Sequence, residues 1–412
     1  MLAAACRIVA AEGLAGLTLR PLAEALGISV TVLSNHYGVR ADIMAAICRA
    51  AREHDTQRLD HWRRLLAGLG SLPPAIAADM AEAILDDLAT EQRTISVLYL
   101  ETLHACTWDA ALAPAFEPWA AQRRAFWHEF AQRAGLAGAL LECAWWQGYV
   151  VAELAYSVAL NAVSSYRMLR RVCLQRLFAG GAAAAPDDAG ATLFALLAEQ
   201  MQRGADSLGA ESGTGHAPEW MARAARACGI RLAEQGASGL THRAIAAEIG
   251  VPHTTLSYRF PTQYDLVTAG LESIAAHILL AVDAGSLTEL QRLRIAGDGK
   301  KLDLARANFA VAIAAARMPE LKDYTASLRS RRGNNLVKVF EQYMPGARGI
   351  DGLCAQVISM GLTGLTNLEP PGEASEQSVA SAFAATAKWL QAGAGQPIPG
   401  RPTDQAAPQR RT

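Results

Sequence analysis

Two short stretches of the chain carry polar side chains of the kinds that contact DNA. The first holds Ser29, Thr31, Ser34, Asn35 and His36, and the second holds His253, Thr254, Thr255, Ser257, Tyr258 and Arg259. Asn pairs with adenine and Arg with guanine in the major groove, while Ser and Thr accept several bases. The residues expected beside these stretches, chiefly at phosphates, are Arg20, Tyr37, Arg40, Arg243 and Gln263. The pattern predicts two surfaces that bind double-stranded DNA.

Both stretches lie in a segment that occurs twice in the chain. Residues 10–44 align with residues 233–267 without a gap, and twelve of the 35 aligned positions are identical. Both copies share the spacing Thr-x4-Ala-x3-Gly-x5-Leu-x3-aromatic-x4-Asp, which runs from Thr18 to Asp42 in the first copy. A gapless internal repeat indicates that one structural unit is present twice.

Each copy has the sequence pattern of a helix-turn-helix. Thr18 is suited to cap a short helix, and Gly27 is suited to the left-handed residue that ends it. Ser29 is suited to cap the following helix, which carries the polar residues listed above. In the second copy, Thr241 and Gly250 occupy the places of Thr18 and Gly27. Two such units on one chain can read two half-sites of one operator.

At these residues the chain resembles the tetracycline-repressor (TetR) family of transcription regulators. The match covers about residues 2–44 and 220–267, with the Thr, the Ile/Leu-Ala pair, the Gly, the Leu and the aromatic residue in place. The resemblance implies an all-α protein of two tandem TetR-like units. Each unit would have a three-helix head and a helical ligand-binding and dimerisation domain. Family members usually dimerise through their last two long helices, so we expect the units to pack as an intramolecular pseudo-dimer.

The chain also departs from the family pattern. Val30 and His253 replace a Lys early in the recognition helix, and Ser34 and Ser257 replace a Tyr. These changes leave an alternative open, in which a degenerate TetR-like protein binds other proteins and no DNA. Two further arrangements also stay open: independent domains, and a chain that dimerises again.

Changes in composition divide the chain into six segments. They are a first head (residues 1–46), a regulatory domain (47–207) and a Gly/Ser-rich linker (208–217). A second head (218–268), a second regulatory domain (269–394) and a Pro/Gln/Arg-rich tail expected to be disordered (395–412) follow. Within the first regulatory domain, the pattern predicts one long helix over residues 136–160.

Composition limits the classes of function. The 412 residues are 51% hydrophobic and 19% charged, which fits a globular protein with a large core, and scarce strand signals favour the all-α class. The net charge is −1, and residues 1–60 hold six Arg against six acidic residues. DNA affinity must therefore come from a few placed contacts rather than from a broad basic surface.

Other classes lack their sequence signals. The seven Cys are scattered, without C-x-x-C or Cys/His spacing, so we expect reduced thiols, no metal site and a cytoplasmic location. No signal peptide or membrane-spanning apolar run is evident. The chain has no Gly-rich phosphate loop, H-E-x-x-H or G-x-S-x-G motif, so we expect neither an enzyme nor a cofactor.

Aromatic residues in the first unit suggest a small-molecule site. Six of the eight Trp lie there, beside a few polar residues, and aromatic walls with few polar groups are typical of ligand pockets. Ordinary core packing is the alternative. The residues expected around a small apolar or aromatic effector are Glu101, His104, Trp108, Trp127, Trp145, Trp146, Tyr149 and Glu153. Together the patterns predict a ligand-responsive transcriptional regulator, expected to be a repressor, that reads an imperfectly palindromic operator.

Overall fold

The computed structural model describes the chain apart from residues 181–187, 210–217, 284–302, 335, 338–349 and 395–412. All regular elements of this described part are helices, as the all-α prediction requires. None of these helices is both long and apolar enough to cross a membrane. The predicted tail, and all of the predicted linker except its first two residues, lie outside the described residues.

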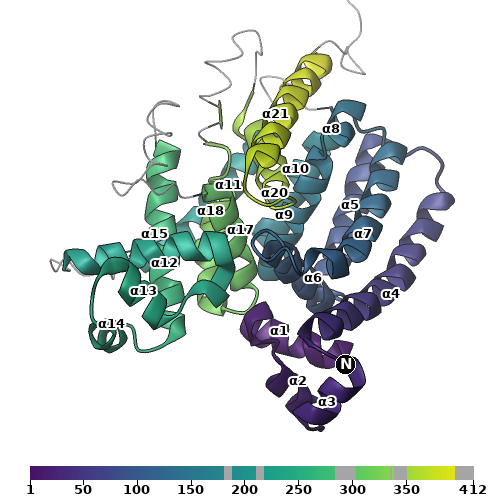
Figure 1. Cartoon of the computed structure of the whole chain (residues 1–412). Coiled ribbons are helices and arrows are strands. Elements are labelled where there is room, and N and C mark those ends of the chain that lie inside the picture. The colour runs from purple at the N-terminus through teal and green to yellow at the C-terminus, as the bar shows by residue number, and fades with distance from the viewer. Residues whose placement is uncertain (181–187, 210–217, 284–302, 335, 338–349, 395–412) are drawn as a thin grey trace, which may run out of the picture.

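Each copy of the repeat folds into three helices in the same order. We call the first three helices head one and their counterparts head two. Both heads project from the body of the molecule, at the bottom and the lower left of Figure 1. Head one comprises α1 (Leu2–Gly16), α2 (Leu19–Ala25) and α3 (Val30–Tyr37), and head two comprises α12 (Glu219–Gln235), α13 (His242–Ile249) and α14 (His253–Arg259).

The turn between the two short helices is built alike in both heads. Gly27 has a φ of +68° and Gly250 a φ of +71°, a left-handed conformation that glycine adopts without strain. The next residue closes the turn through its backbone, since Ile28 N–H donates to the Ala23 carbonyl and Val251 N–H to the Ala246 carbonyl, both at 3.0 Å. The two predicted glycine breaks are therefore present where the repeat places them.

The rest of the first unit is a bundle of long helices, and it corrects one prediction. Residues 136–160 are not one helix, because Ala144 adopts a left-handed φ of 56° that separates α8 from α9. This break turns Trp146 inward, where its Nε1–H donates to the Trp127 carbonyl at 2.8 Å. The helices are α4 (Arg40–Ala67), α5 (Pro74–Ala89), α6 (Arg93–Ala105), α7 (Ala113–Arg133), α8 (Gly138–Glu142), α9 (Trp145–Leu160), α10 (Ser164–Phe178) and α11 (Ala189–Gly209).

The second unit packs its helices directly against the first. Its longer elements are α15 (Gln263–Asp283), α17 (Leu304–Ala315), α18 (Lys322–Ser330), α20 (Gly352–Leu365) and α21 (Glu373–Ala394). Helix α9 lies along α20, and α11 lies along α18. A Cβ on Gly364 would lie 1.7 Å from the Gly148 carbonyl oxygen, so these two glycines let the backbones of α9 and α20 touch.

A buried ion pair crosses the same interface. Arg329 Nη2 of α18 lies 2.8 Å from Glu153 Oε2 of α9, and both side chains are fully buried. Tyr166 donates its hydroxyl to the other oxygen of Glu153 at 2.9 Å. Nearby, the Arg332 guanidinium donates to the Tyr156 hydroxyl at 2.9 and 3.1 Å. The two halves of the chain are thus joined by buried, directional contacts as well as by apolar packing.

Replacement of Arg329 by Met should destabilise the protein strongly. It would leave Glu153 buried without its cation, which typically costs about 3–5 kcal/mol. Urea denaturation followed by circular dichroism measures the loss. The matched control is Arg171→Gln, which removes the exposed pair of Arg171 with Asp79 and should cost at most about 1 kcal/mol. Equal effects of the two substitutions would contradict a structural role of the buried pair.

Candidate nucleic-acid interface and adjoining cavities

Helix α3 presents one face to the core and the other to solvent. Leu33 is fully buried and anchors the inner face. Thr31, Asn35 and His36 are exposed on the outer face, and Ser34 is half-buried at its edge. The first turn of the helix is capped by Ser29, whose Oγ accepts the Val32 N–H at 3.2 Å. The predicted polar residues therefore share one solvent-facing surface.

Helix α14 repeats this distribution position by position. From Pro252 to Arg259 every side chain falls in the same exposure class as its counterpart from Ser29 to His36. Leu256 takes the buried place, and Tyr258 is 90% exposed in the place of Asn35. The exposed residues on α14 are thus His253, Thr254, Thr255, Tyr258 and Arg259, with Ser257 half-buried.

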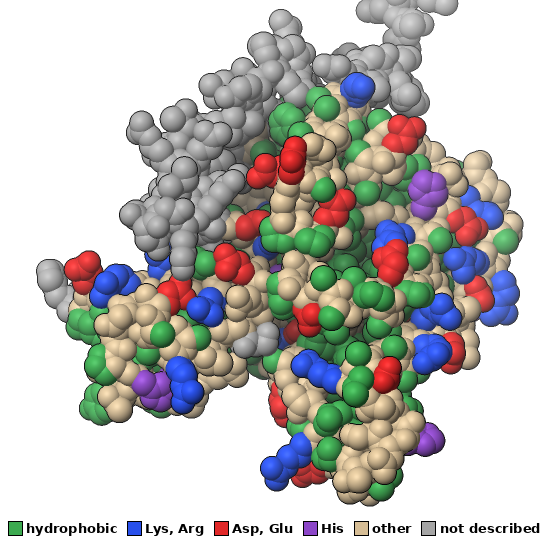
Figure 2. All heavy atoms as spheres, viewed as in Figure 1, with side chains coloured by type: hydrophobic (Ala, Val, Ile, Leu, Met, Phe, Trp, Pro, Cys, Tyr) green, Lys and Arg blue, Asp and Glu red, His purple; other side chains and the backbone are tan. Residues whose placement is uncertain are grey.

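The basic residues around the two faces are available for contacts. Arg20, Arg40, Arg243 and Arg259 are exposed and form no ion pair within the described part of the chain. Lys and Arg do not gather into a basic surface on the face shown in Figure 2, where acidic residues lie among them. Gln263 is exposed as well, and its Nε2 donates to the Leu240 carbonyl at 3.1 Å and so braces head two.

Head one also exposes four apolar side chains on and beside α3. The exposed fractions are 37% for Ile28, 38% for Val30, 52% for Val32 and 67% for Val39. By the residue pattern, Ile28 would fill the turn and Val30 would lie on the apolar side of the following helix, but the core of this small head is formed by other residues such as Leu33. In the major groove, apolar side chains of this kind contact the methyl group of thymine.

The repeated Asp of the pattern has a role that the sequence did not reveal. Asp42 Oδ2 accepts the Val39 N–H at 3.1 Å, and Asp265 Oδ2 accepts the Thr262 N–H at 2.8 Å. Hydrogen bonds from Thr262 lower the pKa of Asp265. In both copies the Asp holds the turn that joins the exposed helix to the long helix behind it. The position of each exposed face relative to the body therefore depends on this carboxylate.

Most of the predicted ligand-binding residues form a packed aromatic core. Trp127, Trp145, Trp146 and Tyr149 are almost completely buried, and the rings of Trp146 and Tyr149 stack with their centroids 5.9 Å apart. Glu153 is occupied by its ion pair. None of these five residues lines any of the three cavities described for the chain. The alternative of ordinary core packing fits their placement.

The other three predicted residues meet at a small cavity between the heads. Glu101, His104 and Trp108 line this cavity, which has a volume of about 200 Å³. Gly13 and Gly236, which are aligned positions of the repeat, line it from the two heads. Their φ values are +71° and +60°. The end of α6 therefore touches the same corner of each head.

Glu101 links head one to the second unit. Its Oε2 accepts the Leu14 N–H at 3.3 Å, and its Oε1 pairs with Arg317, which follows α17. The Arg317 guanidinium covers Gly13 so closely that a Cβ there would lie 3.1 Å from it. Glu101 thus joins head one to a residue of the second unit.

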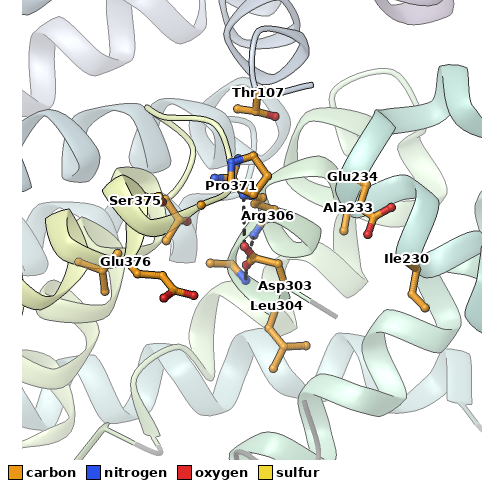
Figure 3. Close-up of a pocket in the computed structure, with 14 residues that line it drawn as sticks. Thr107, Ile230, Ala233, Glu234, Asp303, Leu304, Arg306, Pro371, Ser375 and Glu376 are labelled. Carbon is orange, nitrogen blue, oxygen red and sulfur yellow. Dashed lines mark hydrogen bonds and ion pairs between the residues drawn. The ribbon is translucent and has the colours of Figure 1, made fainter. Parts of the chain in front are cut away.

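A larger cavity lies in the second unit, where we did not expect one. It has a volume of about 570 Å³ and lies between α12, α17 and α21. Figure 3 shows Arg306 near its centre, paired with Asp303. Its walls come from residues far apart in sequence, from Thr107 to Val379. No local sequence pattern marks such a site.

Comparison with known proteins supplies no family. No protein-family model matches the chain, and no curated protein matches it either. The features that bear on function are therefore the internal repeat, the two exposed faces and the cavities. The strongest of these features is that both copies of the repeat expose the same helix face. The two sequences differ at most outward positions, so sequence identity alone does not explain the matching exposure.

Acid should destabilise the protein through His104. Burial is the main cause that lowers the pKa of His104 from 6.5 to about 3, and the charge of Arg306 acts in the same direction. Because the folded pKa is depressed, the neutral ring contributes its full stability above pH 6.5, and this stability is lost as the pH falls towards 3. The loss is on the order of several kcal/mol.

The measurement is the urea midpoint as a function of pH, for the wild type and for His104→Gln. Glutamine cannot take up the proton, so the midpoint of the variant should fall less between pH 6.5 and pH 4. Parallel curves would show that His104 is not the group responsible. His128→Gln, at an exposed position on α7, serves as the control.

Proposed function

We propose that the protein is a transcriptional regulator that binds double-stranded DNA with both heads and responds to a small ligand. The observation that carries this proposal is the matching exposure of residues 29–36 and 252–259, position by position, in two copies with different outward residues. A helix with one anchored face and one free polar face is what enters the major groove in such regulators. The resemblance to the TetR family favours repression as the mode of action.

The two heads would read different half-sites. Head one offers Asn35, which suits adenine, beside the exposed Val30 and Val32, which suit thymine methyl groups. Head two offers Arg259 and His253, which suit guanine. The operator should therefore combine an A·T-rich half with a half that contains G·C pairs. In regulators of this kind the half-sites lie about one helical turn apart.

Few phosphate contacts are available to support these base contacts. From α2 to the start of α4, and from α13 to the start of α15, the exposed arginines without ion pairs among the described residues number four: Arg20, Arg40, Arg243 and Arg259. Each phosphate contact contributes about −0.9 to the slope of log K against log salt concentration. We therefore expect a shallow slope, no steeper than about −4.

One observation favours a second function. Ile28, Val30, Val32 and Val39 give head one an exposed apolar surface, and such surfaces also mark protein interfaces. In this alternative, head one binds a protein partner and the chain does not bind DNA. Only the first function predicts that the chain protects DNA in a footprint.

The test of DNA binding is a footprint on the DNA upstream of the gene, with the stoichiometry of the complex from light scattering. The proposal expects one chain to protect two unlike half-sites about one helical turn apart. Absence of protection at low salt, with a folded protein, would overturn DNA binding and favour the protein-interaction alternative. If the operator does not lie upstream of the gene, selection of bound sequences from random DNA with the same protein would identify it.

Single substitutions should affect one half-site each. Asn35→Ala should weaken binding by about 1–3 kcal/mol and relax specificity only in the A·T-rich half, and Arg259→Ala should do the same only in the other half. Binding to operators with each half randomised separates the two effects. Arg64→Ala, which removes an exposed positive charge far along α4, is the control. A uniform loss across both halves would contradict base reading by these residues.

A further inference from the structure

We infer that the cavity between α12, α17 and α21 binds a small zwitterion, an amino carboxylic acid with an apolar body. The inference replaces the aromatic core of the first unit as the expected ligand site. The claim that this ligand changes the affinity for DNA rests on the proposed function. The claim that the cavity binds the ligand does not. The cavity volume, about 570 Å³, lies within the range of small-molecule sites in proteins.

The floor of the cavity contains an incompletely paired cation. Arg306 is only 2% exposed, with Nε 3.2 Å from Asp303 Oδ2 and Nη2 donating to the Glu369 carbonyl at 2.7 Å. Its Nη1 is buried and has no hydrogen-bond partner among the residues that the structure describes. A buried donor without an acceptor is costly, and a carboxylate is the acceptor that guanidinium groups prefer. The floor therefore favours a ligand carboxylate.

The rim of the cavity carries the opposite charge. Glu234 on α12 and Glu376 on α21 are exposed and lie on opposite sides of Arg306 in Figure 3. Neither forms an ion pair within the described part of the chain. A ligand with only a carboxylate would meet these two negative charges at the entrance. A ligand with an added ammonium group would pair with them instead.

Apolar side chains form part of the walls between floor and rim, beside the polar Thr107 and Thr366. Ile230, Ala233, Leu304 and Val379 line the cavity, and the hydroxyl of Ser375 lies among them. Apolar walls with a few placed polar groups favour a ligand whose charged ends are separated by a hydrocarbon body. A simple cation would leave Arg306 unsatisfied, and a simple anion would face the acidic rim, so the zwitterion fits best.

The cavity is placed to act on head two. Ile230, Ala233 and Glu234 belong to α12, the first helix of that head, and Thr107 belongs to the first unit. A ligand that contacts both sides would bind one position of α12 better than another. Such differential binding is what shifts a protein between two arrangements. The relative position of the two heads would then depend on the ligand.

Isothermal titration calorimetry on the full chain without DNA tests the site with three matched probes. They are phenylalanine, phenethylamine, which lacks the carboxylate, and 3-phenylpropanoate, which lacks the ammonium group. We expect phenylalanine to bind at least about tenfold more tightly than either of the others. Equal binding of phenethylamine or of phenylpropanoate, or no binding of any probe at millimolar concentration, would overturn the inference.

Two sets of variants assign the charged groups. Arg306→Gln should reduce phenylalanine to the affinity of phenethylamine, and the double variant Glu234→Gln/Glu376→Gln should reduce it to that of phenylpropanoate. The double variant alters exposed side chains only, so it decides the matter even if Arg306→Gln fails to fold. Glu117→Gln, at an exposed position on α7, is the control and should bind like the wild type. Unchanged phenylalanine affinity in the double variant would overturn the assignment of the rim.

The effect on DNA is measured separately. With an operator found by footprinting or selection, saturating phenylalanine should change the affinity of the wild type for DNA and leave that of Glu234→Gln/Glu376→Gln unchanged. Binding of phenylalanine without any change in DNA affinity would overturn the regulatory role and leave the site itself supported. A chain that binds no DNA at all would overturn the proposed function, while calorimetry still decides the site.

Discussion

The direct backbone contact between α9 and α20 is the constraint on which the rest of the structure depends. Gly148 and Gly364 have no side chains to separate the two helices, and the buried pair of Glu153 with Arg329 closes the interface beside them. A buried ion pair is weak evidence for net stability, but it strongly disfavours any packing that would separate its partners. The interface therefore fixes how the first unit lies on the second, and with it where each head is held.

The two heads share a geometry while differing in chemistry. The residues that shape each head are the repeated ones, such as Gly27 and Gly250 in the turn and Leu33 and Leu256 in the core. The residues that point outward are mostly different. The fold depends mainly on the residues at buried and strained positions. The residues on the outward face can therefore differ between the heads without loss of structure. This division makes the heads alike in shape and unlike in what they can contact.

The sequence predicted the local features well and the long-range ones poorly. The glycine turns and the short helices follow from neighbouring residues, so the repeat revealed them. The break at Ala144 depends on where Trp146 finds its partner, and the cavity around Arg306 brings Thr107 of the first unit together with three helices of the second. The exposure of Val30 was missed for a different reason. Helical spacing shows which side of a helix is apolar, but not how many of its side chains a small three-helix head can bury. The assignment of the outward residues to DNA stays a prediction.

The joining of both heads in one polypeptide has a consequence for how binding would depend on protein concentration. A regulator that must first find a second copy of itself loses its active form on dilution, because dimerisation and DNA binding are coupled. Here the second head is supplied at a high effective concentration by the chain itself. Occupancy of an operator would then follow a simple hyperbola down to the lowest expression levels. A substitution in one head would also alter one half-site alone, so the two halves of the operator would be free to diverge independently.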